Sequence, residues 1–256
     1  MSDDKRSSYN VAVIFLHPAC NMSCSFCITE DIFDAMTQEQ ALELLQTLKK
    51  ENFKSIVFGG GEPFEWHGKL IELTKEAKRL GFQVQLGTNA VSLPHHYQTI
   101  ESVDRFVLPL ESATSSVHNR MRFYKNKHHQ TIVDCLETLR SAKKSVTIST
   151  ILTQINKDGL EDLAVYLKKL NAPENFIHAW HLYKFIPQGR GGSINAASLM
   201  ISDEQYSKAC ESVMRMELPF RIYQRRDMYH SKSVDFFWYQ EGRLQQASKK
   251  REKVLT

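Results

Sequence analysis

The chain has 256 residues, of which 42% are hydrophobic and 24% are charged. These values are ordinary for a folded domain and exclude wholesale disorder and collagen-like structure. No apolar run approaches the ~20 residues of a membrane helix, and the polar N-terminal residues lack the apolar core of a secretory signal. The net charge of +4 is too mild to indicate a nucleic-acid-binding surface. We therefore expect a cytoplasmic protein that binds neither nucleic acid nor membrane.

Short apolar runs alternate with amphipathic stretches along the chain. The predicted strands are Val11–Leu16, Ser55–Phe58, Gln83–Leu86, Arg105–Leu110, Val146–Leu152 and Ile177–Phe185. The predicted helices span residues 37–50, 67–80, 94–101, 129–143, 158–170 and 203–216. This alternation predicts an α/β fold with a parallel sheet and helical crossovers, as an open doubly wound sheet or as a full or partial barrel. In each of these folds, ligands bind at the carboxyl ends of the strands.

The pattern changes after residue 217. Two further strands are expected at Phe220–Tyr223 and Val234–Tyr239, joined by a basic segment. We expect residues 191–247 to form a short C-terminal extension that covers one edge or the mouth of the sheet. Residues 1–10 are expected to be flexible, and residues 248–256 are a charged tail that is expected to fray.

Three of the five cysteines lie close together after the first predicted strand, as Cys20, Cys24 and Cys27. Thiolates with this Cys-x3-Cys-x2-Cys spacing can hold a soft metal centre, whereas disulfides are not expected in a cytoplasmic chain of this size. A closed structural zinc site needs four ligands, and His17 is close enough in sequence to be the fourth. The other two cysteines lie within predicted helices, where small buried apolar residues are expected: Cys135 and Cys210.

A glycine run follows the second predicted strand, where residues 59–63 read Gly-Gly-Gly-Glu-Pro. No Gly-Lys-Ser/Thr follows this run and it contains no G-x-G-x-x-G motif, so a P-loop and a dinucleotide fingerprint are excluded. Glycines at a strand end let the backbone approach a ligand closely, and free carbonyls there can accept hydrogen bonds from a cation.

Taken together, the cysteine and glycine motifs resemble those of the radical SAM (S-adenosylmethionine) superfamily. The resemblance implies a partial (βα)6 TIM-like barrel over residues 11–190. In this family, three cysteines bind a [4Fe–4S] cluster whose open iron is chelated by SAM. An electron from the cluster cleaves SAM to a 5′-deoxyadenosyl radical, which abstracts hydrogen from a substrate. The chain shows no cysteine-rich region of the SPASM type, and it is most similar to viperin-like and cofactor-biosynthesis members.

The resemblance also implies which residues surround the two cofactors. The three clustered cysteines would bind the cluster, Phe26 would pack near the adenine, and Gly60, Gly61 and Glu62 would contact the SAM ammonium group. Arg122, in preference to Arg120, is the candidate partner of the SAM carboxylate. The other cofactor-binding candidates are polar residues at or near strand ends: Thr88, Asn89, Glu111, Ser112, Ser149 and Thr150.

Substrate-binding residues are expected in the later segments, which are rich in cations. The candidates are Lys184, Arg190, Arg225 and Arg226, with Lys232 and Arg243 as further cations. These charges favour an anionic small molecule such as a nucleotide, sugar or cofactor precursor. The glycines that flank Arg190 would let the backbone approach such an anion.

Other polar residues give weaker indications. The tyrosines of the later segments are possible hydrogen donors, without one of them being favoured: Tyr183, Tyr223, Tyr229 and Tyr239. His128 and His129 open a predicted helix and are expected at the surface.

Three function classes follow from these observations. The first is a radical SAM enzyme that acts on a small molecule and takes its electron from a reductant of the flavodoxin or ferredoxin type. The second is a peptide-modifying radical SAM enzyme. The third is a zinc-binding module without enzymatic activity, with His17 as the fourth ligand.

Overall fold

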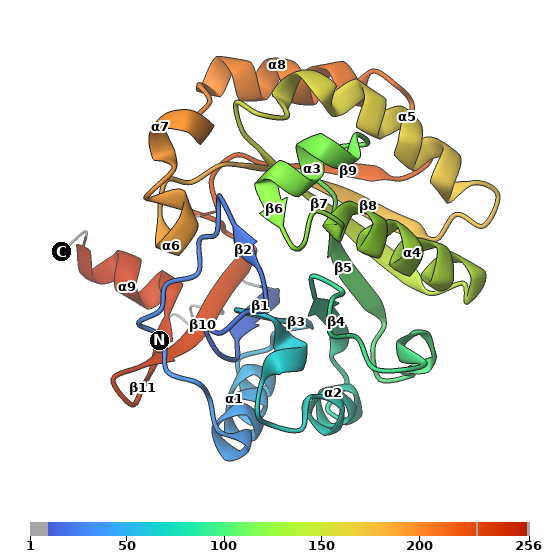
Figure 1. Cartoon of the computed structure of the whole chain (residues 1–256). Helices are drawn as coiled ribbons and strands as arrows, with labels where there is room; N and C mark the ends of the chain where they lie inside the picture. Colours follow the sequence, from blue (N-terminus) through green and yellow to red (C-terminus); the bar gives the residue numbers. More distant parts are fainter. Residues whose placement is uncertain (1–9, 229, 255–256) are drawn as a thin grey trace, which may run out of the picture.

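Six parallel strands form the centre of one continuous sheet (Figure 1). The computed structural model describes residues 10–228 and 230–254. In spatial order, the central strands are β1 (Val11–Phe15), β3 (Ser55–Gly59), β4 (Gln83–Gly87), β5 (Arg105–Pro109), β7 (Ser145–Leu152) and β8 (Ile177–Lys184). Every pairing between these neighbours is parallel, as the sequence predicts. Within the described residues, no pairing closes the sheet into a full barrel.

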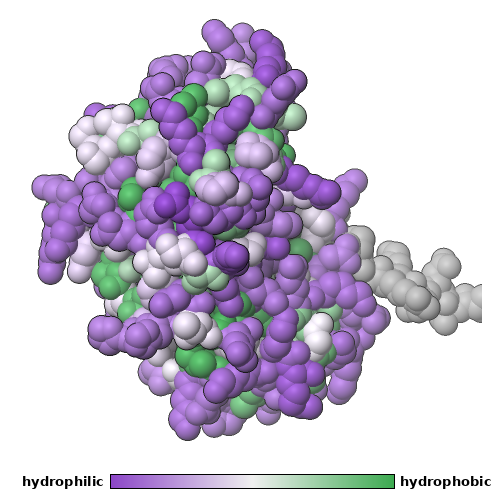
Figure 2. Space-filling view, turned by 90° about the vertical axis from the view of Figure 1, so that its right-hand side faces the viewer, coloured by the Kyte–Doolittle hydropathy of each residue, from purple (hydrophilic) through white to green (hydrophobic). Residues whose placement is uncertain are grey.

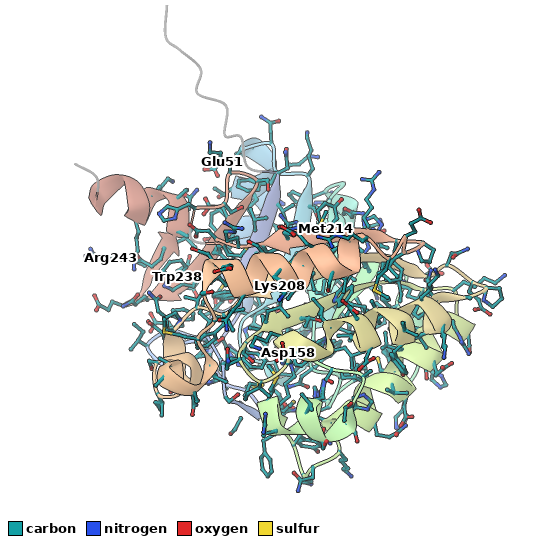
Figure 3. All side chains as sticks on the ribbon, turned by 90° about the horizontal axis from the view of Figure 1, so that it is seen from above. Glu51, Asp158, Lys208, Met214, Trp238 and Arg243 are labelled. Atoms are coloured by element: carbon teal, nitrogen blue, oxygen red, sulfur yellow. The ribbon has the colours of Figure 1, made fainter. Side chains whose placement is uncertain are left out.

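The C-terminal segment extends both edges of this sheet. β9 (Arg221–Arg225) pairs in parallel with β8, and β10 (Val234–Gln240) pairs in parallel with β1. β11 (Arg243–Gln246) adds an antiparallel strand beside β10. Figure 3 shows Trp238 and Arg243 on these outer strands at the side of the molecule. The two predicted C-terminal strands thus form, but on opposite edges of the sheet rather than together over one of them.

The two faces of the sheet carry different side chains because alternate residues of a strand point to opposite sides. On β1, Ala12 and Ile14 are fully buried against the helices, and Phe58 continues this apolar face on β3. The alternate residues Val13 and Val57 line a cavity on the other face. One face therefore builds the core, and the other is available to a ligand.

Helices connect the parallel strands and cover the apolar face of the sheet (Figure 1). The longer helices are α1 (Gln38–Lys50), α2 (Leu70–Arg79), α4 (His128–Ser141), α5 (Leu160–Asn171) and α8 (Asp203–Met214). Shorter elements are α3 (Ser115–Met121), α6 (Gly189–Gly192), α7 (Ala196–Leu199), α9 (Ala247–Val254) and the 3-10 turns η1 (Pro63–Glu65), η2 (Tyr97–Thr99) and η3 (Lys157–Gly159). In Figure 3, α8 carries the labelled Lys208 and Met214 and runs alongside α5.

Two of these helices begin with capping boxes. Thr37 accepts a hydrogen bond from the Gln40 backbone and Gln40 returns one to the Thr37 backbone, which fixes the start of α1. Ser202 and Gln205 make the same reciprocal pair at the start of α8. The core between helices and sheet also contains Cys135 and Cys210, which are buried as predicted.

Two predicted elements differ from the structure. The helix expected over residues 94–101 is only the single turn η2, because Pro94 precedes it and His96 has a left-handed backbone with φ of 60°. Residues 248–254 of the tail expected to fray instead belong to α9, near whose start Ser248 donates its backbone N–H to the buried Asp235 at 3.0 Å. The flexible start expected over residues 1–10 falls almost wholly outside the described residues, as does Tyr229.

The surface is mostly polar. Figure 2 shows one face dominated by hydrophilic residues, with small and scattered hydrophobic patches. None of the helices in the described part of the chain has the length and apolar character that crossing a membrane requires.

Candidate active site

The three clustered cysteines lie between β1 and α1, on a segment that we call the cysteine loop (residues 17–29). Cys24 belongs to β2 (Ser23–Cys24), which pairs with β6 (Arg122–Phe123) and sets Cys24 opposite Arg122. All three cysteines are free thiols with partly exposed side chains. Because the loop follows β1, it lies at the carboxyl ends of the parallel strands, where a ligand is expected.

The glycine run after β3 holds the cysteine loop from one side. A Cβ on Gly61 would lie 1.7 Å from Ala19 O, and a Cβ on Gly60 would lie 2.7 Å from His17 O. The close approach lets Gly61 N donate to His17 O at 2.7 Å and Glu62 N donate to Ala19 O at 2.9 Å. The backbone approach predicted for these glycines is thus made to the cysteine loop itself.

A second glycine run holds the cysteine loop from the other side. A Cβ on Gly191 would lie 2.3 Å from Cys24 O, and a Cβ on Gly189 would lie 2.2 Å from the carbonyl carbon of Ile28. Gly191 N donates to Cys27 O at 3.1 Å. The prediction that these glycines approach an anion is therefore wrong, since the loop backbone already fills the space beside them.

The carboxylate of Glu62 is buried and braces the end of β4. It accepts hydrogen bonds from Thr88 Oγ1 at 2.7 Å and from Asn89 N at 2.7 Å, and a longer one from Phe64 N at 3.3 Å. Burial raises the pKa of Glu62, while these hydrogen bonds act in the opposite direction. Three of the predicted cofactor residues are thus brought together, with Glu62 turned toward its neighbours in the protein.

A buried ion pair joins the ends of β5 and β6. Arg122 Nε lies 2.6 Å from Glu111 Oε1, and the second oxygen of Glu111 accepts from Ile151 N at 2.7 Å. The Arg122 guanidinium lies 4.8 Å from the centre of the Phe26 ring. The competing candidate Arg120 is exposed on α3 and is not among the residues that line the cavity.

A cavity of about 610 Å³ lies on the concave face of the sheet. Cys24, Cys27 and Phe26 line it on the side of the cysteine loop. Four cations also line the cavity: Arg105, Arg122, Lys184 and Arg225. No carboxylate is found among its described lining residues. The cavity thus joins the predicted cluster ligands to a mostly uncharged lining in which the described charged residues are all Arg or Lys.

A comparison with models of known protein families shows which family the chain belongs to. The model of the radical SAM superfamily matches residues 14–167, which include the cysteine loop and the glycine run after β3. The chain belongs to the radical SAM superfamily. It is therefore an enzyme, and its cofactors are a [4Fe–4S] cluster and SAM.

Two relatives of this radical SAM enzyme are named S-adenosylmethionine-dependent nucleotide dehydratase. The one from Lacinutrix mariniflava is 22% identical over 73% of this chain, and the one from Psychrobacter lutiphocae is 21% identical over 74%. The matched region spans 41% of the first relative and 67% of the second.

Solved structures confirm the fold of the radical SAM enzyme. SuiB of Streptococcus suis bound to SAM matches with a TM-score of 0.69 and 15% identity, over 87% of this chain and 52% of SuiB. TYW1 with a lysine-pyruvate adduct matches with a TM-score of 0.52 and 15% identity, over 84% of this chain and 78% of TYW1. The open parallel sheet is thus the partial barrel of radical SAM structures.

The surroundings of the cysteines fit a negatively charged iron–sulfur centre. Asn89 Nδ2 lies 3.6 Å from Cys20 Sγ, and Arg122 Nη1 lies 3.6 Å from Cys24 Sγ. Such donors stabilise thiolate sulfur. Burial raises the pKa of Cys24 to about 11, and binding of a cluster at this sulfur would displace the proton of the thiol.

The third cysteine has a cation beside it. Burial lowers the pKa of Arg190, but Cys27 and Asp31 outweigh burial and raise it. Arg190 Nη1 also donates to Pro18 O at 2.8 Å and to Asp31 Oδ1 at 2.9 Å. The structure therefore places Arg190 against the cysteine loop, where α6 docks, and not among the residues that line the cavity.

The predicted cluster ligands of the cysteine loop do not yet form an assembled metal site. In the described residues, no three His, Cys, Asp or Glu side chains already converge as metal ligands. Rotation about χ1 can change the direction of each cysteine Sγ atom in the loop, so the three sulfurs can turn toward a bound cluster. His17 Nε2 is held by Glu62 O at 2.8 Å. The zinc-binding module without activity is wrong, because the chain belongs to a family of enzymes.

The other predicted substrate cations lie in different places. Lys184 lines the cavity and pairs with Asp203 at 2.9 Å, and Arg225 lines the cavity beside Tyr223. Arg226 instead donates to Ser207 Oγ outside the cavity. The two remaining cations are exposed and do not line the cavity: Lys232 and Arg243.

Neighbouring residues of β7 point to opposite faces of the sheet. Ser149 lines the cavity. Thr150 is fully buried on the helix side, where its hydroxyl donates to Leu110 O at 2.6 Å and accepts from Trp180 Nε1 at 2.9 Å. Ser112 is buried and accepts from Thr114 N at 3.0 Å. Only Ser149 of the three lies among the cavity-lining residues.

Several polar residues in or near the site were missed by the sequence analysis. Arg105 lines the cavity, and the alternation along β5 places it on the same face as Val107 and opposite to the buried Phe106, which is a usable signal. The expectation that His128 and His129 lie at the surface is wrong. Both are buried, because the start of α4 packs against the ends of β4 and β5.

Proposed function

We propose that this enzyme reductively cleaves SAM and removes a hydrogen atom from an anionic small molecule bound in the cavity. One observation carries the proposal. The cavity meets Cys24 and Cys27 at one side, and four cations line it without a carboxylate among its described lining residues. Cations that face a cavity from which carboxylates are turned away attract and orient an anion.

The residues around the cysteine loop have separate tasks in this proposal. Cys20, Cys24 and Cys27 would hold the cluster, which would supply the electron for the reductive cleavage of SAM. The guanidinium of Arg122 lines the cavity, and its Nε is held there by Glu111 Oε1 at 2.6 Å. A guanidinium held in this way is suited to the SAM carboxylate.

Nucleotides are the first substrates to examine. Two relatives are named as nucleotide dehydratases, and nucleotides combine a sugar that carries abstractable hydrogens with a phosphate anion. A cavity of about 610 Å³ lies within the size range of small-molecule sites. We further propose that a flavodoxin or ferredoxin supplies the electron.

The experiment starts from protein reconstituted with iron and sulfide under anaerobic conditions. Reductant and SAM alone are expected to release 5′-deoxyadenosine slowly. A panel of nucleotides, sugar phosphates and carboxylate metabolites is then screened for one that increases this release, with product analysis by mass spectrometry. Acceleration by an anionic small molecule supports the proposal. Acceleration only by peptides would replace it with the peptide-modifying alternative, and failure to release any 5′-deoxyadenosine would refute it.

A further inference from the structure

Large hydrophobic side chains gather at the surface around the cysteine loop. Eight large hydrophobic side chains are exposed in the described part of the chain. Four of them lie on the loop, close behind it or on segments that contact it: Ile28, Ile32, Phe123 and Ile194. Of these four, only Ile28 lines the cavity. Single exposed hydrophobic residues are common, but several beside one loop are typical of a contact surface for another molecule.

Phe123 and Ile194 lie on either side of the loop. Phe123 is 55% exposed and stands opposite Ser23 in the ladder between β2 and β6. Ile194 is 81% exposed, and the next residue, Asn195, donates from Nδ2 to Ser25 O at 3.0 Å. Figure 1 shows β2 between β6 and α6. This stretch of the loop, whose middle residue is a predicted cluster ligand, therefore lies between the two exposed apolar side chains.

The side chain of Phe123 faces away from the cavity. Its neighbour Arg122 lines the cavity, and successive residues of a strand point to opposite sides. A ligand in the cavity does not cover Phe123, so a molecule that contacts it must approach from outside.

Exposed cations lie close to Phe123 in the chain. Residues 112–133 contain no Asp or Glu. Arg120, Lys125 and Lys127 are exposed in this segment, and within the described residues no carboxylate lies at ion-pair distance from any of them. These charges are therefore available to a partner.

Hydrogen bonds hold this basic segment against the loop. Asn119 Nδ2 donates to Asn126 O at 2.8 Å, and Asn119 Oδ1 accepts from His129 N at 2.8 Å. Ser25 N donates to Met121 O at 3.0 Å. The backbone that carries the cations is thus fixed beside the cysteine loop.

The other surroundings of the loop are neutral or acidic. Residues 191–202, which include Ile194, contain no charged residue. Glu30 and Asp31 follow the loop directly, and Asp31 is paired with Arg190 at 2.9 Å. Positive charge without an acidic partner is therefore concentrated on the β6 side, which would give an attracted partner one orientation.

We propose that this outer face of the cysteine loop docks the acidic electron-transfer protein that reduces the cluster. The outer face consists of two apolar residues and three cations: Phe123, Ile194, Arg120, Lys125 and Lys127. The inference rests on the proposed function and identifies where its reductant binds. Because electron transfer slows steeply with distance, the donor has to bind where the cluster ligands lie close to the surface, as Cys24 does in β2.

The chemistry of the outer face favours an acidic redox protein over a second copy of this chain. Flavodoxins and ferredoxins carry negative charge around their redox centres, which complements the cations beside Phe123. Transient redox complexes have small interfaces, and opposite charges accelerate their association. A symmetric dimer through the same face would set the three cations of one copy against those of the other.

The probe is a purified bacterial flavodoxin, and its binding to the reconstituted enzyme is measured by microscale thermophoresis at low ionic strength. The triple variant Arg120→Gln, Lys125→Gln and Lys127→Gln is expected to raise the dissociation constant about 10-fold. Phe123→Ser, which removes the apolar centre, is expected to weaken binding several-fold. Added salt should weaken binding of the wild type more than that of the triple variant.

The matched control removes three other exposed cations that lie on α5 and α8, away from the cysteine loop: Lys168→Gln, Lys169→Gln and Lys208→Gln. This control has the same net charge as the first triple variant and is expected to bind flavodoxin like the wild type. Release of 5′-deoxyadenosine is then compared between two reductants. Release driven by reduced flavodoxin should fall in the first triple variant, whereas release driven by dithionite, which is small and needs no docking surface, should not.

Iron content and thermal unfolding show whether each variant is folded. The inference is overturned if the wild type does not bind flavodoxin, if the first triple variant binds it equally well, or if the control loses as much affinity. It is also overturned if release with dithionite falls as much as release with flavodoxin, or if the wild type is a dimer that Phe123→Ser converts to a monomer. Failure of the proposed function differs, since the wild type then releases no 5′-deoxyadenosine even with dithionite, whatever its affinity for flavodoxin.

Discussion

His118 Nε2 lies 2.8 Å from His128 Nδ1, and this contact joins two strand ends of the active site. The backbone N–H of Glu111 donates to His118 Nδ1 at 3.1 Å, so His118 carries its proton on Nε2 and donates it to His128. His128 Nε2 in turn donates to Asn89 O at 2.9 Å. A single hydrogen-bonded chain thus sets both tautomers and connects the end of β5 to the end of β4.

The stability of the protein is expected to depend on this histidine pair. Burial is the main reason that the pKa falls to about 2 for His118 and to about 4 for His128, below the usual 6.5. The unfolded chain therefore binds more protons between pH 4 and 6.5, so the free energy of unfolding rises with pH in this window and is lost on acidification. We expect His128→Gln, which cannot titrate, to lose less stability than the wild type between pH 7 and pH 5. Thermal unfolding followed by circular dichroism measures this difference.

His95→Gln is the control for the histidine pair, because His95 is exposed. Its unfolding temperature is expected to follow that of the wild type at both pH values. An equal acid-induced decrease in the wild type and in His128→Gln would show that the buried histidine does not contribute to the pH dependence.

The five cysteines are expected to divide into two groups. Alanine at Cys20, Cys24 or Cys27 should abolish loading with about four irons per chain, because each sulfur is one of the three proposed cluster ligands. Cys135→Ala and Cys210→Ala should keep the iron, because both thiols lie in the apolar core. Iron assays and absorption spectra of reconstituted protein test this. Loss of iron from either core variant would indicate a fourth ligand.

The sequence was most informative where local chemistry sets the structure. The strands follow from alternation, and the cysteine spacing identifies the loop without help from tertiary contacts. The choice of Arg122 over Arg120 stays a prediction, and the structure places Arg122 in the cavity lining and Arg120 on the exposed side of α3. These predictions depend on residues that are close together in the chain.

Contacts between distant segments were not predictable in the same way. Arg190 donates a hydrogen bond to Pro18 O although the two residues are 172 positions apart in the chain, and no spacing in the sequence signals that pairing. Which face of the sheet Thr150 lies on depends on the strand register, since a shift of one residue exchanges the two faces. His128 is buried because two strand ends converge on the start of α4, and a helix start alone looks exposed. Long-range packing thus decides what local patterns leave open.

The ion pair between Glu111 and Arg122 is expected to be sensitive to the loss of either charge. Glu111→Gln leaves a guanidinium buried without its partner, and breaking a buried pair in this way typically costs ~3–5 kcal/mol. Urea unfolding of the variant should show this loss, and SAM binding should weaken because Arg122 is no longer fixed. Glu76→Gln is the comparison, since Glu76 pairs with Arg79 on the surface and such pairs contribute little. Similar destabilisation by both changes would contradict a special role of the buried pair.

The docking of the cysteine loop is expected to depend on the glycines that approach it. In Gly61→Ala the new Cβ would lie 1.7 Å from Ala19 O, so the backbone of the cysteine loop must move away from β3. Overpacking of this kind costs ~1–3 kcal/mol and would displace the cluster ligands from their donors. Gly59→Ala is the matched control, because a Cβ there meets nothing within 4 Å. Iron content and unfolding temperature should fall in Gly61→Ala and stay near wild type in Gly59→Ala. Full iron loading in Gly61→Ala would mean that the loop does not require this close backbone contact.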